Sequence, residues 1–87
     1  MITSEQVRAA RMLLRWEQKD LAEASKVSLP SIKRLETQPG ALAAQARTVD
    51  AIRAALEVAG VVFQGDGEMV AGGPGVRLRF GRTTEEI

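Results

Sequence analysis

The side chains best suited to recognition chemistry lie close together, within residues 18–36. Lys33 and Arg34 carry N–H groups that pair well with O6 and N7 of guanine. Leu29 and Pro30 suit apolar contact with a thymine methyl group. A Lys-Arg pair on a helix is ordinarily no more than surface charge. Here the pair lies on a helix that directly follows a predicted turn, which favours contact with nucleic acid.

The chain is poor in the groups that catalysis needs. It contains no His, Cys or Tyr, so the commonest general base and the usual metal ligands are missing. Glu85 and Glu86 are neighbours in sequence and cannot converge on one site as an acid–base pair must. The glycines of residues 65–75 lack the G-K-[ST] ending of a phosphate-binding loop. We therefore expect no enzymatic activity, no cofactor and no metal.

Length and composition indicate one small folded core. The 87 residues are 45% hydrophobic and 26% charged, unlike a disordered chain. A net charge of +1 does not indicate a class of binding partner. Nucleic-acid binding would therefore depend on where the twelve cations lie. No apolar run approaches the roughly 20 residues that span a bilayer, and the first residues do not resemble a secretory leader. We expect a cytoplasmic protein with no membrane segment.

The first helix has two start signals. Thr3 and Gln6 have the spacing of a capping box, and Ile2 and Val7 that of a hydrophobic staple. Helical periodicity then predicts an inward stripe. The expected members of this stripe are Val7, Ala10, Met12, Leu13 and Leu14.

A second helix is expected over about residues 18–25, and a third begins after the break Lys26–Ser28. Glu17 is a weak N-cap for the second helix, whose inward positions are Leu21, Ala22 and Ala24. Ser28 is a good N-cap for the third, and a proline in the first turn costs little. The expected core positions here are Trp16, beside the first turn, and Ile32 and Leu35 in the third helix.

A fourth helix and two strands complete the prediction. Thr48 is the expected cap of the fourth helix, with Asp50 in its first turn, and Gly60 ends it. Residues 61–64 and 76–80 have strand character, and residues 68–71 could add a brief strand. The fold class is thus mainly α, with four to five helices in residues 1–60. Residues 61–87 form a small β-hairpin or strand extension and a polar tail.

The pattern of residues 18–36 resembles the lambda-repressor-like, Cro-type helix-turn-helix family, also called the xenobiotic-response-element family. It reads Q-x-x-L-A-x-x-x-x-V-S-x-x-S-I-x-x-L-E, and the likeness extends over about residues 7–56. The resemblance implies binding of double-stranded operator DNA by a homodimer. The third helix would lie in the major groove, and the second would brace it.

The resemblance also assigns roles by position. Gln18 would bind a phosphate, and Ser31 would contact a phosphate or the edge of the groove. Arg11 would pair with Glu36 and so lock the first helix to the third. The residues that would face the groove are Ser28, Leu29, Pro30, Lys33 and Arg34.

Two positions depart from the family pattern. Arg15 and Lys26 stand where the family commonly has glycine with a positive φ. A non-glycine residue in that conformation costs on the order of 1 kcal/mol. A cation at a helix C-terminus recovers about 0.3–1 kcal/mol through the helix dipole.

Two hypotheses for the function and two for the role of the strand extension stay open. The chain is either a sequence-specific transcriptional regulator, a repressor, or a protein-interaction module of the same fold such as an antitoxin or antiactivator. The acids Glu17, Asp20 and Glu23 and the apolar Leu29–Pro30 tip keep a protein partner open. The strand extension either pairs with its symmetry mate in the dimer or caps the core.

Overall fold

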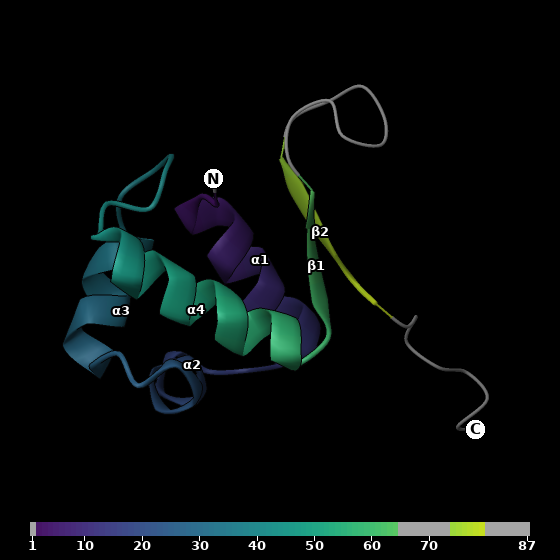
Figure 1. The fold of residues 1–87 in the computed structure, drawn as a ribbon, viewed down its shortest axis with the longest axis horizontal. Helices are drawn as coiled ribbons and strands as arrows, with labels where there is room; N and C mark the ends of the chain where they lie inside the picture. The colour runs from purple at the N-terminus through teal and green to yellow at the C-terminus, as the bar shows by residue number, and fades with distance from the viewer. Residues whose placement is uncertain (1, 65–73, 80–87) are drawn as a thin grey trace.

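The protein is mainly α, with a pair of strands after the helices. The computed structural model describes residues 2–64 and 74–79. Within them lie four helices and one two-stranded antiparallel sheet. The elements in chain order are α1 (Ser4–Leu14), α2 (Gln18–Ser25), α3 (Leu29–Glu36), α4 (Ala46–Val58), β1 (Val61–Gln64) and β2 (Gly75–Leu78). In Figure 1, α4 crosses the molecule, with α3 at one end and the strands at the other.

The predicted start signals of α1 and α3 are confirmed. The backbone N–H of Gln6 donates to Thr3 Oγ1 (3.0 Å), and the Thr3 N–H donates to Gln6 Oε1 (2.9 Å). The staple residues before and after this cap are both buried. At α3, the Ser31 N–H donates to Ser28 Oγ (3.3 Å), and Pro30 lies in the first turn. Both helices therefore begin with their free backbone donors partly satisfied.

The core joins all four helices to the sheet. Its buried members come from the four helices, from β1, from the residues before α1 and from the loop before α4. They are Ile2, Val7, Ala10, Leu21, Ile32, Leu35, Leu42, Ile52, Leu56, Val61 and Phe63. Trp16 is half-buried and packs against this cluster, so the predicted packing role is confirmed.

Two residues predicted to face inward are exposed. Met12 is 70% exposed, because at 100° per residue it lies about 200° around α1 from the buried Ala10. Ala24 is exposed as well, and Ser25 takes the buried position one residue later. The Ser25 hydroxyl donates to the Leu21 carbonyl (2.7 Å), which satisfies it inside the core.

The predicted start of α4 at Thr48 is wrong. The helix begins at Ala46 with Gln45 as N-cap, and Asp50 consequently lies beyond the first turn. The preceding loop is fixed on the start of α1, because the Leu42 N–H donates to the Ile2 carbonyl (3.1 Å). This tertiary anchor lets the chain enter the helix before the better capping residue.

The two strands pack on α1 and α4. β1 and β2 pair with Phe63 opposite Val76, and Arg77 is exposed while its neighbours are half-buried. Half-buried and exposed residues thus alternate from Val76 to Arg79, as in a strand with one face packed on the core. The buried amide of Gln6 donates to the carbonyls of Gln64 (3.1 Å) and Gly75 (2.9 Å). Phe80, the brief strand at 68–71 and the polar tail lie outside the described residues.

Candidate nucleic-acid interface

Helix α3 is buried on one face and exposed on the other. Ile32 and Leu35 are each 1% exposed and pack in the core. Lys33 and Arg34 lie on the exposed side, as does Pro30. The helix therefore presents its basic residues outward from a backbone fixed by core packing.

The C-terminal end of α3 is locked by a buried ion pair. Arg11 Nε donates to Glu36 Oε2 (2.8 Å), and Nη2 donates to Oε1 (2.8 Å). The third guanidinium nitrogen, Nη1, donates to the Trp16 carbonyl (3.0 Å). The Glu36 side chain is 4% exposed and that of Arg11 15% exposed. The predicted pairing is confirmed, and its two parallel bonds fix the orientation of α3 relative to α1.

Gln18 joins the same ion pair at the first residue of α2. Its Nε2 donates to Glu36 Oε1 (3.0 Å), so the amide is oriented from the protein side. An amide nitrogen carries two hydrogens, and one bond to Glu36 leaves the second for an external acceptor. The residue is half-buried, at the surface beside α3.

The two serines of the predicted site, Ser28 and Ser31, are hydrogen-bonded to each other. The Ser28 hydroxyl donates to Ser31 Oγ (2.9 Å) and also accepts the Ser31 N–H. Ser28 is exposed, and Ser31 is half-buried. Leu29 is half-buried too, beside Lys19 and Glu23 of α2, so it is less open to a ligand than Pro30. Of the predicted groove-facing set, Pro30, Lys33 and Arg34 are the most accessible together with Ser28.

Residues 24–46, which include α3, carry no exposed acid. Residues 24–46 contain three cations, Lys26, Lys33 and Arg34, and one acid, Glu36, which is buried against Arg11. By contrast, three cations of the other helices, Arg8, Lys19 and Arg53, contact carboxylates at 3.0–3.9 Å. The α3 region is thus a positive surface in a chain of nearly zero net charge. The scarcity of acids in residues 24–46 can be seen in the sequence, although helical periodicity alone does not predict it.

Arg34 and Ser31 also line an open hollow of about 590 Å³ beside α4. The opposite wall includes Gln45 and Thr48, from the N-cap and first turn of α4. The Gln45 side chain makes no capping bond to the helix. Sequence reasoning missed these two residues, because their place beside α3 depends on how the loop folds back.

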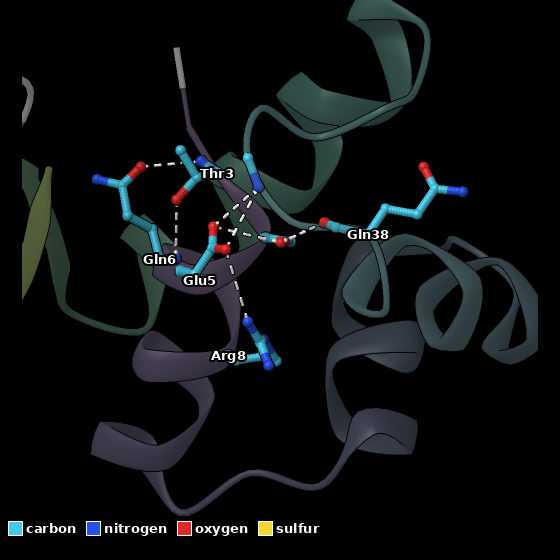
Figure 2. A network of polar contacts seen from close by, with 7 residues as sticks. Thr3, Glu5, Gln6, Arg8 and Gln38 are labelled. Atoms are coloured by element: carbon cyan, nitrogen blue, oxygen red, sulfur yellow. Dashed lines mark hydrogen bonds and ion pairs between the residues drawn. The ribbon is translucent and has the colours of Figure 1, made fainter.

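The start of α1 is tied to the chain that leaves α3, as Figure 2 shows. The Ser4 hydroxyl donates to the Gln38 carbonyl, and the Gly40 N–H donates to Glu5 Oε1 (3.1 Å). The backbone N–H groups of Glu5 itself and of Gly40 hold the pKa of the Glu5 carboxyl below its ordinary value, and Arg8 adds to the effect. The chain that leaves α3 is therefore tied to the start of α1.

Both expected left-handed turns are present. Arg15, after α1, has φ 59°, and Lys26, after α2, has φ 64°. The Arg15 N–H donates back to the Met12 carbonyl (3.1 Å), as in a helix C-terminal turn.

Comparison with known proteins assigns no family to the chain, so the proposed function depends on the geometry of the structure. Searches against protein-family models, curated proteins and solved structures found no match. Within residues 2–64 and 74–79, no three acidic side chains gather into a metal-binding group. No helix in that part of the chain has the length and apolar character needed to cross a membrane.

Proposed function

We propose that this protein is a sequence-specific DNA-binding regulator of transcription, a repressor that binds double-stranded operator DNA as a homodimer. In this proposal α2 and α3 form a helix-turn-helix of the lambda-repressor-like, Cro-type family. Helix α3 lies in the major groove and α2 braces it. The observation that carries the proposal is the exposed face of α3, which is basic and free of acids while its other face is core.

Base readout would fall to the exposed residues of α3. Arg34 and Lys33 have no acid partner within the described residues, so their N–H groups are available to guanine O6 and N7. A good bidentate contact discriminates between bases by about 1–3 kcal/mol. Pro30, with the less exposed Leu29, suits a thymine methyl group. The helix contains no Asn or Gln, so bidentate adenine readout is not expected.

Phosphate contacts would surround this readout helix. Gln18 has an N–H group remaining after its bond to Glu36, and Ser28 is exposed at the start of α3. Gln45 and Thr48 border the hollow beside Arg34 and could meet the neighbouring backbone. Such contacts position the protein on the duplex and carry no sequence information themselves.

A protein-interaction module, such as an antitoxin or antiactivator, is the second candidate. The observation in its favour is that the exposed Glu23 of α2 borders a hollow with Leu29, the residue before the exposed Pro30. Counterion release makes DNA affinity fall steeply with salt, whereas a protein–protein contact need not behave so. Salt dependence therefore separates the two functions.

Selection of genomic DNA fragments on the purified protein, followed by sequencing, tests the proposal. We expect enriched fragments that share paired half-sites about 10–10.5 bp apart, because a two-fold dimer presents its α3 helices to successive turns of one DNA face. Fragments enriched without a shared motif, or no enrichment at low salt, would count against a sequence-specific regulator.

A further inference from the structure

A second hollow, apolar in character, lies between α2 and the C-terminal half of α4. It has a volume of about 390 Å³ and is lined by Trp16, Ala24, Ser25, Ala51, Ala54, Ala55, Val58 and Ala59. Val58 at its border is 86% exposed, the highest exposure of a large hydrophobic residue in the described chain. A shallow alanine-lined depression thus lies directly beside a protruding valine.

We infer that this hollow is covered by a second copy of the chain, with α4 packed antiparallel on the α4 of its mate. Ala51 lies three residues before Ala54, and Val58 lies three residues after Ala55. A two-fold axis between Ala54 and Ala55 therefore places each Val58 over the partner's Ala51, inside the partner's hollow. Such a surface is self-complementary, as a two-fold interface requires.

Charge along α4 favours the same antiparallel arrangement. Arg47 is exposed near the N-terminus, one turn before Ala51, and its side chain has no ion pair or hydrogen bond to another described residue. The C-terminal half of α4 carries Arg53 and Glu57, which pair with each other (3.0 Å). With this axis, each Arg47 lies opposite residue 62 of the partner, just beyond the C-terminal end of the partner's α4. That end has the negative pole of the helix dipole, so the two ends attract.

This interface rests on the proposed function, because it supplies the homodimer that operator binding needs. It also differs from pairing of the strands, since the hollow lies at α2 and α4 whereas β2 packs on α1. The test can therefore be made without DNA, and its outcome is separate from that of DNA binding.

Single cysteines test the interface directly, because the natural chain has none. Ala54 is exposed, so Ala54→Cys should leave the fold intact. We expect this variant to form a disulfide-linked dimer on mild oxidation. The matched controls, Met12→Cys on the exposed side of α1 and Arg77→Cys on β2, should remain uncrosslinked. Ala54→Glu should sediment as a monomer with an unchanged helical circular dichroism spectrum.

The alternatives give different results. Wild-type protein that sediments as a monomer at high concentration would overturn the inference, and so would a dimer that Ala54→Glu leaves intact. Cross-linking through Arg77→Cys instead of Ala54→Cys would assign the dimer to the strands and would also overturn it. Cross-linking at Ala54→Cys in a protein that binds no DNA would support the interface while counting against the proposed function.

Discussion

At the scale of single residues, Glu36 determines the geometry of the proposed DNA surface. Its carboxylate accepts two bonds from Arg11 and one from Gln18, so one buried acid orients α1, α2 and α3 together. Removing one partner of a buried pair leaves a charge without compensation, which is far more costly than losing a surface pair. The acid that completes α3 is therefore structural, and the exposed face of the helix keeps its positive charge.

The left-handed turn after α2 gives a prediction at the same scale. Lys26 has φ 64°, a conformation in which glycine is unstrained and residues with a Cβ atom are not. Lys26→Gly and Lys26→Ala both remove the charge, so their comparison isolates the backbone. We expect the glycine variant to be more stable by about 1 kcal/mol. Urea unfolding of the pair measures this, and equal midpoints would show that the turn carries no strain.

At the scale of elements, the start of α1 and the loop after α3 form one unit through Glu5. The carboxylate accepts the Gly40 N–H, and its pKa lies below the ordinary value of 4.5. A lowered folded pKa stabilises the fold at pH values above the unfolded pKa. This contribution is lost as the pH falls through the lower folded value.

Glu5→Gln should therefore be less stable than wild type near neutral pH. The difference between the two should shrink as the pH is lowered below about 4.5. Thermal unfolding across this pH range measures the stability of wild type and of Glu5→Gln. Glu23→Gln is the matched control, because Glu23 is exposed on α2 and makes no bond to another described residue. A Glu5→Gln difference that stays constant with pH would mean that ionisation of Glu5 does not support the loop.

Capping residues and helical periodicity predicted the helix starts correctly where local interactions determine them. The Thr3–Gln6 box and the Ser28 cap fixed the starts of α1 and α3 as the sequence indicated. The start of α4 was missed because Leu42 anchors the loop from a distance, which no local pattern records. The polar hollow at Gln45 was missed for the same reason. Ala24 was misplaced because small apolar residues suit both the core and the exposed hollow.

At the scale of the whole molecule, the elements separate two surfaces. Helix α3 lies at one end of the protein and the strands at the other, with α4 between them (Figure 1). The positive surface of residues 24–46 lies at the α3 end, while the apolar hollow follows the C-terminal half of α4. Under the proposed function and the inferred dimer, this arrangement would leave α3 free to bind DNA while α4 pairs with a second copy.

DNA affinity as a function of salt tests the central claim most directly, on a fragment enriched from the genome. We expect the logarithm of the binding constant to fall linearly and steeply with the logarithm of salt concentration. Arg34→Ala should lose about 1–3 kcal/mol on that fragment. Arg53→Ala, which removes a half-buried cation paired with Glu57 on α4, should bind as wild type does. Affinity that is insensitive to salt, or an equal loss in both variants, would contradict DNA recognition by α3.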